Sequence, residues 1–142
     1  MAPLVINALA TCVMVGVIWF VQLVHYPLLA TIGIDRASEI AVEHQRRTGW
    51  VVGLPMAGEG ATTLWLLFDL PNGVNSALPF VGGFLLAIAL GSTIFLSVPL
   101  HEKMALAPTA DIGHKLVRTN WPRTIAWTLR GVLLAMMLLQ AT

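Results

Sequence analysis

Charged residues and cysteine are both scarce in this sequence. Asp, Glu, Lys and Arg make up 11% of its 142 residues, whereas they make up about 25% of an ordinary soluble domain. With a net charge of +1 the chain has no basic field for phosphate groups, so we expect no nucleic acid partner. Cys12 is the only cysteine, which excludes an internal disulfide and a metal centre built from cysteines.

Apolar residues, in contrast, make up 57% of the chain. That share corresponds to about 81 side chains, and a membrane-spanning helix needs about 20 mostly apolar residues. The composition therefore predicts an integral membrane protein with four spans, which has the lipid bilayer as a partner.

Four apolar stretches have the length of a membrane-spanning helix, and they cover approximately residues 4–25, 50–70, 77–100 and 121–139. The first stretch lacks the basic residues with which a secretory signal begins, and it is longer than the apolar region of such a signal. We therefore interpret it as a retained helix. Pro71 and Gly73 mark a turn between the second and third stretches. We therefore predict an all-α fold, a single integral membrane domain over residues 1–142 built as an up-down bundle of four transmembrane helices.

Most of the charged residues fall in two loops, residues 31–48 and 101–120. Glu43 and Arg47 have the i,i+4 spacing of a helix, so we expect a short interfacial helix in the first loop, and another helix from about Thr109 in the second. The basic residues of these loops are Arg36, Arg46, Arg47, Lys103, Lys115 and Arg118. Such loops stay in the cytoplasm, which predicts a bacterial inner membrane protein with both termini outside.

Polar residues of different spans converge at the predicted cytoplasmic end. His25 ends the first span, His101 ends the third, and Arg123 lies at the start of the fourth. Each span continues inward with polar positions at helical spacing, and this predicts a polar pocket inside the bundle. The candidate substrate-binding residues on these faces are Gln22, Ser97, Asn120, Arg123, Trp127 and Arg130. We expect His44 and His114 to be solvated residues of the charged loops.

Two charges lie deeper in the predicted spans. Glu59 of the second span and Arg130 of the fourth are at similar depth, so we expect an ion pair that forms the floor of the pocket. Such a pair also has a purely structural use, because it can fix the register of the helices. Likewise, Arg123 at a helix start can extend toward lipid headgroups without binding any substrate.

The catalytic candidates are His25, His101 and Glu59. A histidine exchanges protons near neutral pH, and a buried carboxylate can act as a base. Arg123 and Arg130 provide positive charge for a substrate oxygen. No local metal-binding motif is present; if the protein holds a metal or haem, His25 and His101 are the residues we expect to ligate it, and the cofactor is otherwise unknown.

The stretch from Ser97 to Arg130 resembles part of a known family. Val98-Pro99-Leu100-His101, Leu116-Val117 and Asn120-Trp121-Pro122-Arg123 are similar to segments of the small four-helix membrane proteins grouped with anthrone oxygenases. Where that family has a Pro-x-Asn-x-x-Leu pattern, this chain keeps Pro99 but has His101 in place of Asn and Met104 in place of Leu. The resemblance implies a four-helix fold and, as in some members, oxidation of polycyclic phenols without an evident cofactor.

Our leading hypothesis is a membrane-embedded oxidoreductase, oxygenase-like, that acts on a lipophilic aromatic or quinone-like small molecule. The same pocket also suits a non-catalytic unit that binds or transports a small anion or lipid. A third interpretation is an accessory subunit whose polar stripes serve assembly. Small residues at four-residue spacing, such as Gly83, Ala87 and Gly91, favour close helix packing and a homo-oligomer.

Overall fold

The computed structural model describes residues 1–141, except for the side chain of Ile34. All regular secondary structure in these residues is helical. The elements are α1 (Ala2–Phe20), the π-helical segment η1 (Val21–His25), α2 (Tyr26–Thr31), α3 (Ile34–Phe68), α4 (Ala77–Ser92), the π-helical segment η2 (Thr93–Ser97), α5 (Val98–Leu106), α6 (Ala110–Thr119) and α7 (Trp121–Gln140).

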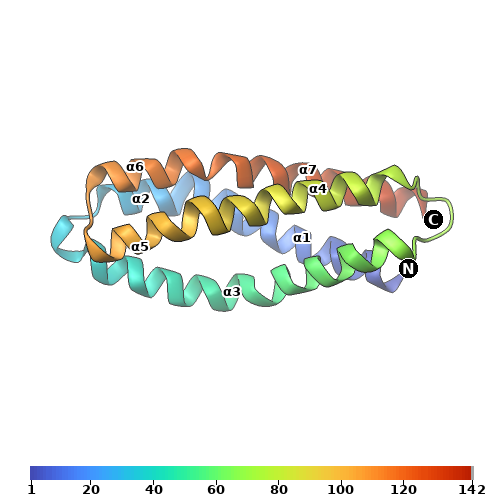
Figure 1. Cartoon of the computed structure of the whole chain (residues 1–142), viewed down its shortest axis with the longest axis horizontal. Coiled ribbons are helices and arrows are strands. Elements are labelled where there is room, and N and C mark those ends of the chain that lie inside the picture. Colours follow the sequence, from blue (N-terminus) through green and yellow to red (C-terminus); the bar gives the residue numbers. More distant parts are fainter. Residues whose placement is uncertain (142) are drawn as a thin grey trace.

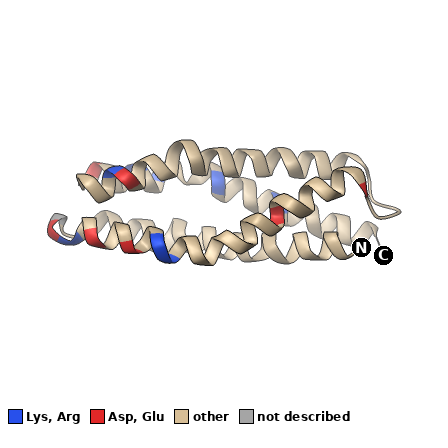
Figure 2. Cartoon of the chain, turned by 60° about the horizontal axis from the view of Figure 1, so that its bottom comes forward, with Lys and Arg blue, Asp and Glu red and all other residues tan. Residues whose placement is uncertain are grey.

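These elements form four long helices, each long and apolar enough to cross a membrane. They cover Ala2–Thr31, Asp35–Phe68, Ala77–Leu106 and Ala110–Gln140, so the four predicted spans are confirmed as helices. In Figure 1 the helices lie along one long axis, with both termini at one end and α2, α5 and α6 at the other. We refer to the latter as the charged end, because Lys, Arg, Asp and Glu gather there (Figure 2).

The helices at the charged end extend further than the predicted spans. The first loop, residues 31–48, was expected to contain a separate interfacial helix, but from Ile34 onward it is the first part of α3, which runs without a break to Phe68. Glu43 and Arg47 make the predicted contact, at 2.5 Å. In the second loop, α6 follows Thr109, whose hydroxyl accepts a hydrogen bond from the backbone N–H of Ile112 and caps the helix. The charged residues therefore lie on helical extensions of the bundle.

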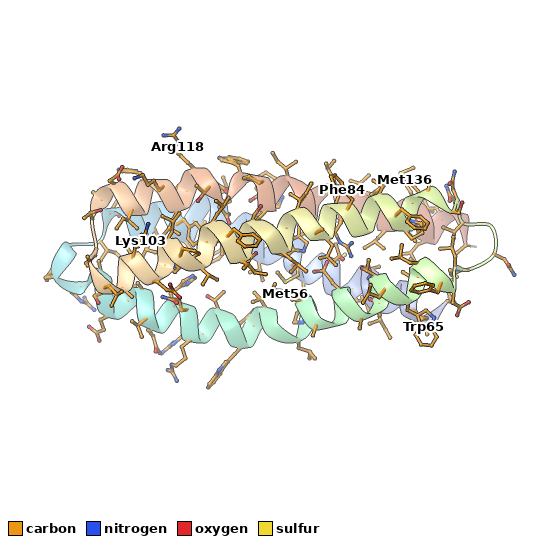
Figure 3. The ribbon with its side chains drawn as sticks, viewed as in Figure 1. Met56, Trp65, Phe84, Lys103, Arg118 and Met136 are labelled. Atoms are coloured by element: carbon orange, nitrogen blue, oxygen red, sulfur yellow. The ribbon has the colours of Figure 1, made fainter. Side chains whose placement is uncertain are left out.

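Apolar side chains cover the outside of the bundle. Leu54 is 83% exposed and Phe68 91% exposed, and Figure 3 shows Trp65 and Phe84 pointing away from the helices. A soluble domain rarely exposes so much continuous apolar surface. Together with the four long apolar helices, this surface indicates an integral membrane protein.

Two π-helical segments precede prolines at the same distance. η1 ends two residues before Pro27, and η2 ends two residues before Pro99. Proline lacks an N–H, and its ring crowds the carbonyl four residues earlier, which belongs to the π segment in both helices. Each π turn accommodates an extra residue and rotates the chain that follows. Tyr26 and His101, which follow the two π turns, are both buried.

Candidate functional site

Four aromatic side chains form a cluster inside the charged end. The Tyr26 hydroxyl and Nε2 of His101 are hydrogen-bonded at 2.7 Å, which connects α2 to α5. The ring of His44, from α3, lies 5.1 Å from that of His101 and is stacked on His25 at 4.1 Å. Two ring nitrogens of this cluster, Nε2 of His25 and Nδ1 of His101, are buried and have no hydrogen-bond partner among the described residues.

Arg123 brings a positive charge to this cluster from the first turn of α7. One guanidinium nitrogen donates to Ser97 Oγ at 2.9 Å and to Asn120 Oδ1 at 3.1 Å. The guanidinium also lies 5.5 Å from the centre of the Trp127 ring. No carboxylate of residues 1–141 pairs with Arg123, and its Nε is buried without a partner.

A hydrogen-bonded group behind Arg123 fixes the start of α7. Gln22 Oε1 accepts hydrogen bonds from Asn120 Nδ2 at 2.9 Å and from Thr124 Oγ1 at 3.2 Å. The Gln22 amide nitrogen donates to the carbonyl of Val117 at 3.1 Å. All three polar side chains are buried, so these contacts hold η1, α6 and α7 together and set the direction of Arg123.

A cavity of about 200 Å³ lies against Arg123 and the aromatic cluster. It opens between α3 and the helix that contains η2 and α5. Its polar lining comprises Tyr26, His44, Gln45, Thr48, Thr93, Ser97, His101 and Arg123. Apolar groups on the side toward the bundle centre, including Met56 (Figure 3), complete the wall. We call this space the polar cavity.

A second space, of about 410 Å³, lies between α1 with η1 and α3. Its lining is mostly apolar and consists of Gly16, Val17, Phe20, Val21, His25, His44, Arg47, Thr48 and Val51. We call it the apolar groove. His44 and Thr48, hydrogen-bonded to each other at 3.1 Å, line both spaces and form the wall between them.

Deeper in the bundle, Glu59 and Arg130 form the predicted ion pair. Arg130 Nε and Glu59 Oε1 are 3.5 Å apart, and both side chains are almost completely buried. Thr11 donates to Glu59 Oε1 at 2.5 Å, and Trp127 Nε1 donates to Glu59 Oε2 at 3.0 Å. Both carboxylate oxygens are therefore already engaged within the protein.

The guanidinium of Arg130 also donates hydrogen bonds to three further groups. It donates to the carbonyl of Gly82 at 2.6 Å, to Asn7 Oδ1 at 2.9 Å and to Thr63 Oγ1 at 3.1 Å. These partners belong to α4, α1 and α3. A buried charge pair that is surrounded by hydrogen bonds fixes the relative position of helices. The network thus joins all four long helices near the middle of the bundle.

The predicted site residues separate into two groups. Ser97, His101 and Arg123 line the polar cavity, and His25 lines the apolar groove. The remaining candidates have their polar groups in contact with other parts of the protein: Gln22, Asn120, Trp127, Arg130 and Glu59. Trp127 touches the site only indirectly, because its ring faces Arg123 while its N–H is bound to Glu59.

Two members of the cluster differ from the sequence-based interpretation. The expectation that His44 is a solvated loop residue is wrong, because α3 begins earlier than predicted and stacks His44 on His25. His114, in contrast, is exposed as expected. Tyr26 was not predicted; the signal was its position as the single tyrosine, next to His25 and directly before Pro27.

For a metal, the arrangement offers little. Within residues 1–141 no group of three or more His, Cys, Asp or Glu side chains is arranged to hold a metal ion. His25 and His44 are stacked with their rings 21° from parallel, whereas metal ligands direct ring nitrogens toward one point. Ligation by His25 and His101 stays a prediction.

Comparison with protein-family models, with curated proteins and with solved structures found no match to this chain. The site therefore has to be interpreted from its own geometry.

Proposed function

We propose that this chain is a membrane-embedded oxidoreductase, oxygenase-like, that acts on a lipophilic aromatic or quinone-like molecule in the polar cavity. The observation that carries the proposal is the environment of Arg123. A guanidinium without a carboxylate partner among residues 1–141 faces a cavity, next to an imidazole whose Nδ1 is buried and unpartnered. Buried polar groups left without a partner are the expected contacts of a bound ligand.

In this proposal Arg123 binds an oxygen of the substrate, and His101 exchanges a proton with it. Ser97 and Asn120 hold the guanidinium in place through their hydrogen bonds to it. A cation close to a carbonyl oxygen stabilises the negative charge that develops there when a carbon conjugated with the carbonyl loses a proton. Nδ1 of His101 takes that proton, and Tyr26 at Nε2 fixes the orientation of the ring.

The reaction class that suits these groups is oxidation of an acidified methylene by molecular oxygen. The substrate CH₂ group loses a proton to His101, and the resulting carbanion, stabilised as a phenolate, combines with O₂ to give a peroxide anion, which takes the proton back from His101 and becomes a hydroperoxide. Loss of water from the hydroperoxide then gives a carbonyl, so that R₂CH₂ and O₂ become R₂C=O and H₂O. Dioxygen is the only oxidant, and both of its oxygen atoms and all four electrons are accounted for.

The resemblance to the anthrone-oxygenase-like family supports the same reaction class and belongs to this proposal. The arrangement of the protein in the membrane is also part of this proposal. We propose an up-down topology with the charged end in the cytoplasm, residues 35–48 at the membrane surface, and the polar cavity within reach of substrates dissolved in the bilayer. Basic residues at the charged end, as in Figure 2, support this orientation.

The proposal is tested with anthrone, which has an acidic CH₂ group opposite a carbonyl. Protein in lipid nanodiscs is mixed with anthrone in air, and anthraquinone formation is measured against nanodiscs without protein. We expect turnover by the natural sequence, about a hundredfold lower kcat for His101→Gln, and unchanged kcat for Arg118→Gln. Arg118 is a matched control, since it is exposed at the same end and points away from the bundle (Figure 3).

Anthrone that binds to the protein without being converted would contradict the oxidoreductase proposal and favour a binding or transport unit. Equal rates for the natural sequence and His101→Gln would contradict the role of His101.

A further inference from the structure

The apolar groove and the polar cavity share two lining residues, His44 and Thr48. Both residues belong to α3 and are one turn apart, so the two spaces adjoin along this face of the helix. A flexible chain that passes these two side chains can therefore occupy both spaces. The reaction proposed above takes place in the polar cavity and does not involve the apolar groove.

We propose that the ligand of this protein is an amphiphile with an aromatic head and a hydrocarbon tail. The head carries a phenolic or carbonyl oxygen and binds in the polar cavity beside Arg123, while a single alkyl or prenyl tail lies in the apolar groove. This inference rests on the proposed function for the head and adds the tail.

The chemistry of the groove favours a hydrocarbon chain as its occupant. Five of its nine lining residues have no polar side-chain atom: Gly16, Val17, Phe20, Val21 and Val51. Phe20 and Val51 are more than half exposed, so this wall continues onto the outer surface of the bundle. The only charge in the lining, Arg47, is already paired with Glu43. An extended peptide would need hydrogen-bond partners for its backbone that these side chains do not provide.

The volumes of the two spaces also favour a ligand that occupies both of them. The polar cavity measures about 200 Å³, whereas sites that enclose a small organic ligand usually measure about 300–1,000 Å³. A head group alone fits the smaller space, and the groove of about 410 Å³ supplies the additional volume. Its position next to the lipid-facing surface lets a tail enter directly from the bilayer.

Glycines in the two walls allow each space to be filled separately. A Cβ atom at Gly16, in the groove, or at Gly49, in the polar cavity, would meet no atom within 4 Å. Larger side chains there extend into free space, and replacing a helical glycine does not weaken a helix. Gly53, one turn after Gly49 on α3, is equally open but lines neither space, and therefore provides the control.

The test measures equilibrium binding of phenol, 4-butylphenol and 4-octylphenol to protein in nanodiscs, after subtraction of binding to empty nanodiscs. For the natural sequence we expect affinity to rise with tail length. Gly16→Phe should weaken the binding of 4-octylphenol about tenfold, which is the loss expected when about two methylenes no longer reach an apolar wall. The same substitution should leave the binding of phenol unchanged. Gly49→Val should weaken the binding of all three compounds, and Gly53→Phe should leave the binding of all three unchanged.

Val51→Phe fills the groove from the opposite helix and provides a second test if Gly16→Phe does not fold. Affinity that does not depend on tail length, or equal loss with Gly16→Phe and Gly53→Phe, would overturn the inference. Tail-dependent binding without anthrone oxidation would support the amphiphile and contradict the oxidoreductase. Oxidation of anthrone, together with binding that depends neither on tail length nor on Gly16→Phe, would support the oxidoreductase and contradict the amphiphile.

Discussion

The Tyr26 hydroxyl and His101 Nε2 are 2.7 Å apart and fix the orientation of the one imidazole that lines the polar cavity with a free Nδ1. Tyr26→Phe removes this contact and leaves Nε2 of a buried ring unpaired, at a cost of about 1–3 kcal/mol in stability. We expect kcat for anthrone to fall about tenfold while KM changes little, because proton transfer depends on ring orientation.

The pH profile of kcat distinguishes this role from simple packing. A positioning role for Tyr26 predicts that the profile of Tyr26→Phe is displaced along the pH axis. A purely structural role would lower the rate by the same factor at every pH, and an unchanged kcat would contradict the assignment.

The buried pair of Glu59 and Arg130 gives a prediction on stability. Arg130→Gln leaves a buried carboxylate without its cation and should cost about 3–5 kcal/mol. The double variant Glu59→Gln with Arg130→Gln should be more stable than Arg130→Gln alone, because no uncompensated charge remains. Thermal unfolding in detergent of the two single variants and the double variant measures this coupling.

The exposed pair of Glu43 and Arg46, 2.7 Å apart, is the control for the buried pair. Replacing either of its residues by Gln should leave the melting temperature unchanged, because solvent screens exposed charges. Independent, additive effects of Glu59→Gln and Arg130→Gln would refute the coupling of the buried pair.

Close packing of α6 on α2 leads to a second stability prediction. A Cβ atom at Gly113 would lie 2.7 Å from the Cα atom of Ala30, so Gly113→Ala must push the two helices apart. We expect a loss of about 1–3 kcal/mol. Gly60→Ala, at a helical position where a Cβ meets nothing within 4 Å, should instead gain about 0.5–1 kcal/mol. A stable Gly113→Ala protein would show that α6 is not tightly packed on α2.

The proposed orientation is tested with a membrane-impermeant maleimide on intact cells. In a Cys12→Ser background, Asn72→Cys in the turn between α3 and α4 should react from outside, and Lys115→Cys in α6 should react only after lysis. The reverse pattern would place the charged end outside.

The sequence predicted the parts of this molecule that depend on composition and depth. Four apolar stretches became four long helices, and equal depth was enough to pair Glu59 with Arg130. The cluster at the charged end could not be predicted in the same way, because rotation about each helix axis decides which side chains meet. The π turns before Pro27 and Pro99 change that rotation, and helical spacing alone does not reveal them.

Polar residues of the opposite half were also underestimated. Asn7 and Thr11 are one helical turn apart in an otherwise apolar stretch, and they were not assigned a partner. In the structure both are buried, with Thr11 bound to Glu59 and Asn7 to Arg130. A polar pair at i,i+4 in an apolar helix was the available signal.

The central claim is that Arg123 holds its charge for an oxygen of the ligand. The most direct test compares the binding of 4-octylphenol with that of its methyl ether, 4-octylanisole, to the natural sequence and to Arg123→Gln in nanodiscs. We predict that the natural protein prefers the phenol about tenfold, as expected for a hydrogen bond to a charged group, that Arg123→Gln loses this preference, and that Arg123→Lys retains part of it. Equal affinity of the natural protein for both compounds, or a preference that survives in Arg123→Gln, would contradict the claim.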